Sequence, residues 1–165
     1  MNAPEPLQIR RPQIRAMTAS DVDAVVALDR SSEGTPHWAA GDYLSCFENR
    51  GDSALRRVGL VAHWNQAFAG FAVARYVIAS GGAEAELESI AVPRNMRGRG
   101  IGRALLGSVI DAAKLHGADR LELEVRASNS AAIRLYQRAG FAKTGRRRSY
   151  YRNPDEDAVL MSVKL

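Results

Sequence analysis

The chain is 165 residues long, with 46% hydrophobic and 25% charged residues and a formal net charge of +5 at pH 7. This length and composition suit one globular domain with a sizeable core. The sequence has no apolar run long enough to span a membrane, and its single cysteine, Cys46, excludes an internal disulfide. A lone thiol fits a reducing cytoplasm, and the positive charge favours acidic partners such as nucleic acid, ribosomal surfaces or polyanionic small molecules.

The amino-terminal residues 1–12 are expected to be a disordered leader to a single domain over residues 13–165. They contain charges and prolines but no apolar segment, so they do not form a signal peptide. A short strand is predicted over 13–17. Thr18 then caps a helix, with Asp21 three residues later.

A run of strands is predicted in the middle of the chain. Pro36 breaks regular structure before a second helix over 40–48. Strands are then expected over 57–64, 67–77 and 84–92. Tight turns join them at Asn65-Gln66 and Ser80-Gly81-Gly82.

A glycine-rich segment follows, with the sequence Arg97-Gly98-Arg99-Gly100-Ile101-Gly102-Arg103. Glycines remove the Cβ atoms that would keep a ligand off the backbone, and successive N–H groups at a helix N-terminus form an anion site. The spacing fits neither a P-loop nor a dinucleotide fingerprint. The segment therefore predicts a phosphate site, with a plain glycine turn before an amphipathic helix as the alternative.

The last third of the chain alternates helices and strands. A helix is predicted over 101–115, a strand over 120–125, and a helix from a cap at Ser128 or Asn129 to Arg138. Tyr150 and the stretch 157–163 make a final pair of strands. The order β-α-α-β-β-β-α-β-α-β-β predicts an α/β fold with a mixed sheet and helices on both faces.

The pattern Arg-x-x-Gly-x-Gly resembles the acetyl-CoA pyrophosphate loop of the GNAT N-acetyltransferase superfamily. Further segments resemble the RimI-type ribosomal-protein-alanine N-acetyltransferases of this superfamily. The resemblance is close over residues 87–165. Over residues 13–83 it is limited to the order of the elements and a Pro-x-Trp loop. These segments are Leu123-Glu124-Val125-Arg126-Ala127-Ser128-Asn129-Ser130-Ala131-Ala132-Ile133, Leu135-Tyr136 with Ala139-Gly140-Phe141, Arg147-Arg148-Ser149-Tyr150-Tyr151, and Glu156-Asp157-Ala158.

The resemblance implies an acetyltransferase whose pantetheine arm lies along a strand edge exposed where the strand 120–125 splays away. A backbone N–H near Val92 would then act as the oxyanion donor. The residues expected to bind acetyl-CoA are Ile90, Ala91, Val92, Arg97, Gly98, Arg99, Gly100, Ile101, Gly102, Arg103 and Asn129. For Asn129, a helix N-cap is the alternative role, and one side chain can serve both.

Two catalytic residues follow from the same resemblance. Glu124 is expected to be the proton acceptor and Tyr136 the proton donor to the departing sulfur. Because Glu122 and Glu124 share a strand face, alternation alone does not separate them. Glu88 is a rival base, and direct loss of the proton to water is a third route. For Tyr136 the alternative is a tyrosine packed in the core.

The acceptor is expected to be the N-terminal α-amine of a protein, with a small-subunit ribosomal protein as the partner. A small-molecule amine is the alternative, and a silent acyl-CoA-binding or ribosome-associated module is the alternative from another class. The loops around Trp38 and Tyr150-Tyr151 would form the walls of the acceptor site.

Several other groups are expected to have no part in the chemistry. The basic segment 143–152 is interpreted as a solvated strand or loop, with no direct nucleic-acid binding, although its mixture of arginines and tyrosines suits such a patch. Cys46 is expected to be structural and not a nucleophile. The histidines His37, His63 and His116 are scattered without ligand spacing, so no metal is predicted.

Overall fold

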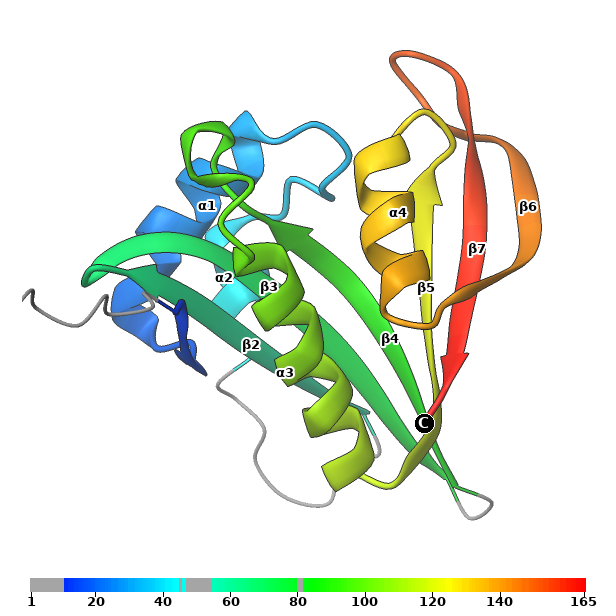
Figure 1. Cartoon of the computed structure of the whole chain (residues 1–165), viewed down its shortest axis with the longest axis horizontal. Helices are drawn as coiled ribbons and strands as arrows, with labels where there is room; N and C mark the ends of the chain where they lie inside the picture. Colours follow the sequence, from blue (N-terminus) through cyan, green and yellow to red (C-terminus); the bar gives the residue numbers. More distant parts are fainter. Residues whose placement is uncertain (1–10, 45, 47–54, 80–81) are drawn as a thin grey trace, which may run out of the picture.

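A mixed sheet of seven strands forms the centre of the computed structural model, which describes residues 11–44, 46, 55–79 and 82–165 (Figure 1). The strands are β1 (Gln13–Ala16), β2 (Leu55–Trp64), β3 (Ala67–Ala79), β4 (Gly82–Ala91), β5 (Ala118–Arg126), β6 (Ala142–Tyr151) and β7 (Glu156–Lys164). The helices are α1 (Val22–Ser31), α2 (Ala40–Leu44), α3 (Ile101–Leu115) and α4 (Ser130–Arg138), with short 3-10 turns at Ala19–Asp21 and Arg94–Met96.

The strand order across the sheet is β1-β2-β3-β4-β5-β7-β6. Neighbours are antiparallel except for β4 and β5, which α3 connects as a parallel crossover. The predicted order of elements is confirmed, with strand ends shifted by a few residues. Most of the leader at 1–12, the end of the helix at 40–48 and part of the turn at 80–82 lie outside the described residues.

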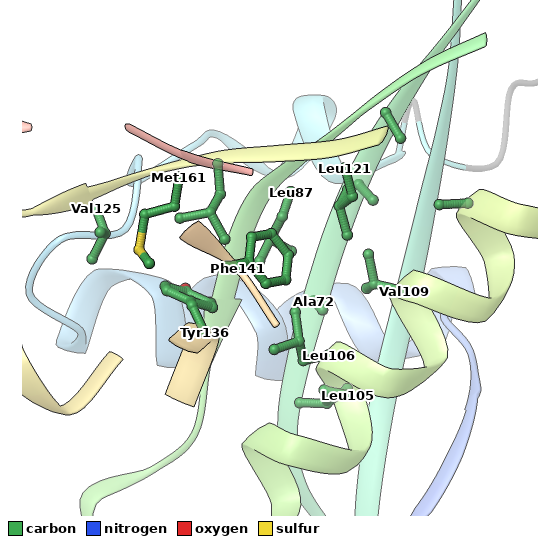
Figure 2. Close-up of a cluster of buried hydrophobic side chains, with 14 of the residues drawn as sticks. Ala72, Leu87, Leu105, Leu106, Val109, Leu121, Val125, Tyr136, Phe141 and Met161 are labelled. Atoms are coloured by element: carbon green, nitrogen blue, oxygen red, sulfur yellow. The ribbon is translucent and has the colours of Figure 1, made fainter. Parts of the chain in front are cut away.

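Two apolar cores flank the sheet. On one face, α3 contributes Leu105, Leu106 and Val109, and α4 contributes Tyr136, all buried against the sheet (Figure 2). On the other face, α1 and α2 cover a smaller core built around Val25, Tyr43 and Phe71. This second core covers part of the face that carries Glu122 and Glu124, and leaves the rest of that face open to solvent.

β4 and β5 are paired for only part of their length. The pairing stops at Leu87 with Leu123, although β4 continues to Ala91 and β5 to Arg126. Beyond that point each strand keeps its outer partner, β3 for β4 and β7 for β5. The two strands therefore diverge toward their carboxyl ends, as Figure 1 shows, and the predicted splay is confirmed.

A β-bulge in β4 changes the direction of its last side chains. Against β3, Leu87 pairs with Ala74 and Ser89 pairs with Val73, so Glu88 is the extra residue. Leu87 lies in the core under α3, whereas Ala91 lies in the core under α1 and α2. In a regular strand Leu87 and Ala91, four positions apart, would face the same side, since strand side chains alternate with a period of two; the extra residue places them on opposite faces.

The first helical segment is anchored to β1 by Asp21. Its carboxylate accepts from the backbone N–H of Thr18 at 2.8 Å and forms an ion pair with Arg15 at 2.7 Å. The capping role that the sequence predicts for Thr18 and Asp21 is present. The hydrogen bond and charge of Arg15 hold the pKa of the buried Asp21 carboxyl far below its usual value.

We expect Asp21→Asn to destabilise the protein by about 1–2 kcal/mol at pH 7, because the amide keeps the backbone cap but loses the charge-assisted bond to Arg15. Since folding lowers the pKa of Asp21, its contribution is complete above the unfolded value of about 3.9 and is lost as the pH falls further. Denaturant unfolding at pH 7 and pH 3 measures this. Asp23→Asn, an exposed change in the same helix, is the control; an equal deficit at both pH values would contradict the assignment.

Candidate active site

The glycine loop lies between the end of β4 and the start of α3. Gly98 and Gly100 both have φ of +79°, and a Cβ on either would meet no atom within 4 Å. A left-handed φ favours glycine, so these two residues hold the loop open to solvent. Within the described part of the chain, the backbone N–H groups from Gly98 to Arg103 donate to no protein acceptor. The loop thus presents a series of free donors at a helix N-terminus, which is an anion site.

Arginines fix this loop to its surroundings. Arg97 donates through Nε to the backbone oxygen of Val92 at 3.2 Å, which ties the loop to the end of β4. The guanidinium of Arg99 lies over the ring of Trp64, 5.8 Å from its centroid. Arg103 is exposed on the first turn of α3. Three arginines are thus carried by the loop and the first turn of α3, and their role in binding phosphate stays a prediction.

The exposed strand edge begins where β4 leaves β5. Ile90 and Ala91 lie on this edge, and the N–H of Val92 donates to no acceptor in the described residues. At Gly70 of β3 a Cβ would lie 2.6 Å from the backbone oxygen of Ala91, so a larger residue would push β3 away. The edge is thus held firmly on its β3 side and is open on its β5 side.

Glu124 lies on β5 just beyond the last residue that pairs with β4. Its side chain is 20% exposed, and Oε1 lies 2.8 Å from a guanidinium nitrogen of Arg147 on β6. The pKa of Tyr150 is raised, chiefly because its phenol hydrogen-bonds the Glu124 carboxylate. Glu122, two residues earlier, is much more exposed and pairs with Arg120 at 3.3 Å. The structure therefore separates the two glutamates that alternation alone does not distinguish.

Tyr136 is a core residue, and its role as proton donor stays a prediction. It is 5% exposed, and its ring lies 5.7 Å from that of Phe141, close to Val125 and Met161 in Figure 2. Burial, and then the nearby Tyr151, raise the pKa of Tyr136, so its phenol stays protonated at neutral pH. Burial followed by the charge of Glu124 raises the pKa of Tyr151 to about 12.

Asn129 is the N-cap of α4. Its Oδ1 accepts from the backbone N–H of Ala132 at 3.1 Å, which leaves the amide nitrogen available to a ligand. The preceding turn is held by Glu156 of β7, which accepts from the N–H of Ser128 and pairs with Arg126 at 3.2 Å. Arg126 in turn lies over the Tyr151 ring, 4.3 Å from its centroid. These contacts fix the β6–β7 end of the molecule against α4.

Glu88 belongs to a charged network that the sequence analysis did not identify. Arg57 binds both Glu88 oxygens, at 2.7 and 2.9 Å, and its guanidinium lies 4.8 Å from the centroid of the Trp38 ring. Arg75 lies 3.8 Å from Glu88 and also pairs with Glu86. Alternating acidic residues on β4 and basic residues on β2 and β3 indicate charged strand faces, but the pairing itself depends on the register across three strands. Glu88 is therefore held more tightly than Glu124.

A hollow of about 310 Å³ adjoins Glu124 on the open face of the sheet. Its lining comes from β3, β4 and β5 and from β6 and β7, and its charged lining residues are Arg75, Glu84, Glu86, Glu122, Glu124 and Arg147. None of Trp38, Tyr150 and Tyr151 is among the residues that line this hollow, so the expectation that their loops form the walls of the acceptor site stays a prediction. The hollow opens Glu124 to solvent from this face.

The remaining groups show no sign of chemistry. Cys46 is buried, and burial raises the pKa of its thiol to about 11. No three potential ligands among residues 11–44, 46, 55–79 and 82–165 gather closely enough to hold a metal ion. No described helix is both long and apolar enough to cross a membrane. The basic segment 143–152 lies largely on the exposed edge strand β6, as expected, and its lack of nucleic-acid binding stays a prediction.

The site and fold agree with a family of known proteins. Residues 25–141 match the model of the Acetyltransferase (GNAT) family, which spans most of the chain. The chain therefore belongs to the GNAT acetyltransferase family, and the resemblance seen in the sequence is confirmed.

Individual proteins extend this likeness. The chain is 34% identical to the [ribosomal protein bS18]-alanine N-acetyltransferase of Escherichia coli (strain K12) over 92% of its own length and 97% of the relative. It resembles the crystal structure of the Escherichia coli ribosomal-protein-S18-alanine N-acetyltransferase with a TM-score of 0.75 and 33% identity, and the match covers 93% of this chain and 94% of that one. Arabidopsis thaliana NAA60, solved with acetyl-CoA, shares the fold with a TM-score of 0.79 and 22% identity, and the match covers 94% of this chain and 99% of that one. The protein is accordingly an acetyl-CoA-dependent N-acetyltransferase.

We expect Gly100→Glu to abolish CoA binding, because it places a negative charge at the free N–H groups. Gly100→Ala is the matched control, since it has the same left-handed backbone strain, of about 1–2 kcal/mol, without the charge. Isothermal calorimetry with CoA, alongside circular dichroism, measures both variants. Unchanged CoA affinity in Gly100→Glu would show that the phosphates bind elsewhere.

Tyr136→Phe is expected to keep CoA binding and lose turnover by about 10²–10⁴-fold, the usual contribution of a general acid. The change removes a hydroxyl and little volume, so packing is preserved. Tyr76→Phe is the matched control, because Tyr76 is equally buried and its hydroxyl has no partner in the described residues. A loss of only twofold in Tyr136→Phe would make Tyr136 a core residue alone.

Proposed function

We propose that the protein transfers the acetyl group of acetyl-CoA to the N-terminal α-amine of a protein, with a small-subunit ribosomal protein as the acceptor. The observation that supports this most directly is the position of Glu124 at the splay, with the open face of the sheet on its acceptor side. The relatives named as bS18-alanine N-acetyltransferases match over nearly the whole chain, which favours a peptide acceptor of the same kind. We place the reaction in the cytoplasm, where the single thiol of Cys46 stays reduced.

The glycine loop would hold the phosphates of acetyl-CoA. Its free N–H groups and the three arginines around it neutralise pyrophosphate. The open edge at Ile90 and Ala91 would hydrogen-bond the pantetheine amides as an added strand does, and the amide nitrogen of Asn129 would add a further contact. The thioester carbonyl would then lie near the free N–H of Val92, the donor that stabilises its oxyanion.

Glu124 would take a proton from the acceptor's ammonium, since only a neutral amine is nucleophilic. The nitrogen lone pair then forms the C–N bond while the C–S bond breaks. The ammonium gives up two protons in all, and the thiolate takes one, so the reaction releases one proton. Tyr136, kept protonated by its burial, is suited to supply the proton to the sulfur.

Glu88 is the rival base, because it too follows the last paired residue of its strand. Its carboxylate is bound by Arg57 through both oxygens and is only 11% exposed. Deprotonation of an ammonium would require this bidentate pair to break in a partly buried setting, which is costly. Glu124 has a single exposed arginine partner, so it is the better candidate.

A small-molecule amine is the second candidate acceptor. The charged residues that line the hollow beside Glu124 suit a polar amine as well as a peptide. An acetylation assay read by mass spectrometry distinguishes the two. We expect activity on free N-terminal peptides that begin with alanine, and little on polyamines, amino acids or a lysine in an N-terminally blocked peptide. Lysine has a pKa near 10.4 against about 8 for an α-amine, a difference of roughly 3 kcal/mol in deprotonation. Equal rates on the blocked lysine peptide would refute the N-terminal assignment and leave the family unchanged.

Glu124→Gln is expected to reduce kcat/KM most at low pH. Without a base the enzyme depends on the neutral fraction of the peptide, which falls about tenfold per unit below the α-amine pKa of about 8. With Glu124 ionised, the enzyme accepts the ammonium directly. The deficit should therefore shrink as the pH rises from 6 to 9.

Glu122→Gln is the matched control, because it removes the same charge from the same face of β5 two residues away. Because Glu122 lines the hollow but lies beside the paired part of β4 and β5, it should lower activity less than Glu124→Gln and by the same factor at every pH. If the deficit of Glu124→Gln does not vary with pH, Glu124 positions the peptide and does not take its proton.

A further inference from the structure

Glu124 already has a cationic partner in the structure. A guanidinium nitrogen of Arg147 lies 2.8 Å from its Oε1, and the guanidinium also lies 5.4 Å from the centroid of the Tyr150 ring. The same carboxylate is the chief cause of the raised pKa of the Tyr150 phenol. The carboxylate that is placed to receive an ammonium is therefore occupied by another N–H cation.

We propose that Arg147 takes the place of the acceptor's ammonium on Glu124, so that binding of the acceptor exchanges one cation for another. The inference rests on the proposed function, because it requires Glu124 to receive an α-ammonium. It makes Arg147 a residue that sets the affinity for substrate and product, and not a catalytic residue.

The ion pair of Arg147 with Glu124 is easily broken, as a comparison with the ion pair of Arg57 and Glu88 shows. The Arg147 side chain is 54% exposed and contacts Glu124 through one nitrogen, on β6 at the edge of the sheet. The Arg57 side chain is 29% exposed, binds Glu88 through both oxygens and lies over Trp38. Arg147 also contacts the Tyr150 ring, but an exposed ion pair made through one nitrogen contributes little to stability, so an ammonium displaces it at small cost. The bidentate pair at Glu88 has no such freedom.

The exchange distinguishes substrate from product. Before the reaction the acceptor is an ammonium. It carries the same charge as Arg147, with which it competes for the carboxylate. After the reaction its nitrogen is a neutral amide that no longer pairs with a carboxylate. Once Glu124 has lost its proton to water, Arg147 returns to it and the acetylated N-terminus is displaced. The same arginine that weakens acceptor binding therefore speeds product release.

Arg147→Gln tests this. Loss of the competing cation should lower the KM for an alanine-initiated hexapeptide by about two- to fivefold, the range expected for an exposed ion pair. The inhibition constant of the N-acetylated hexapeptide should fall by a similar factor. Calorimetric titration of both peptides into the protein with CoA gives the same comparison without turnover.

Three further variants separate the exchange from other roles of Arg147. Arg147→Lys keeps the cation and should behave as the wild type. Arg148→Gln removes the same charge from the next residue on β6 and should change neither constant. In a Glu124→Gln background, Arg147→Gln should no longer lower the KM, because the two effects are coupled through one carboxylate.

The outcomes are decisive in each direction. A KM that is unchanged or higher in Arg147→Gln, with the wild type active on α-amines, overturns the exchange and leaves the proposed function intact. A coupling that persists without the Glu124 carboxylate also overturns it. If the wild type acetylates no α-amine, the proposed function fails first, and the exchange with it.

Discussion

The structure depends on one interruption in its hydrogen bonding, the end of pairing between β4 and β5 after Leu87 and Leu123. Backbone groups left unpaired inside a sheet are costly unless something else satisfies them. Each strand keeps its outer neighbour, so the interruption does not unravel the sheet. The glycine loop, Glu124 and the end of α4 all lie around it. The unpaired edge is where a ligand can supply hydrogen bonds that the protein has left out.

The charges around this opening fall into two groups. Near the glycine loop, positive charge faces free backbone donors, which suits polyphosphate. On the opposite face, carboxylates are matched by arginines from neighbouring strands, tightly at Glu88 and loosely at Glu124. The chain as a whole is basic, yet the lining of the hollow beside Glu124 is acidic, with four glutamates against two arginines. A cationic N-terminus therefore meets no barrier of like charge there.

Much of the fold could be predicted from the sequence because its signals are local. Helix caps and tight turns are determined by residues that are close together in the chain. The structure shows the predicted caps at Thr18 and Asn129 and the predicted turn at Asn65-Gln66. The glycine loop is of the same kind. The pairing of Arg147 with Glu124, and of Arg57 with Glu88, joins residues far apart in the chain. Such contacts depend on register between strands, which alternation of residue types does not determine.

The bulge at Glu88 shows a second limit to what the sequence predicts, the direction of the side chains along β4. Alternation predicts that Glu84, Glu86, Glu88 and Ile90 share one face, but the extra residue turns Ile90 toward α3 and Ala91 toward α1 and α2. Before Glu88 the odd-numbered residues of β4 face α3, and after it the even-numbered residue Ile90 does. If β4 kept Glu88 but paired regularly through it, the last side chains of the strand would turn over even though every residue kept its type. The faces of Ile90 and Ala91 are therefore set by the bulge and not by residue type, and a one-residue insertion between Ser89 and Ala91, which would turn the residues after it to the other face, is less tolerable than most substitutions.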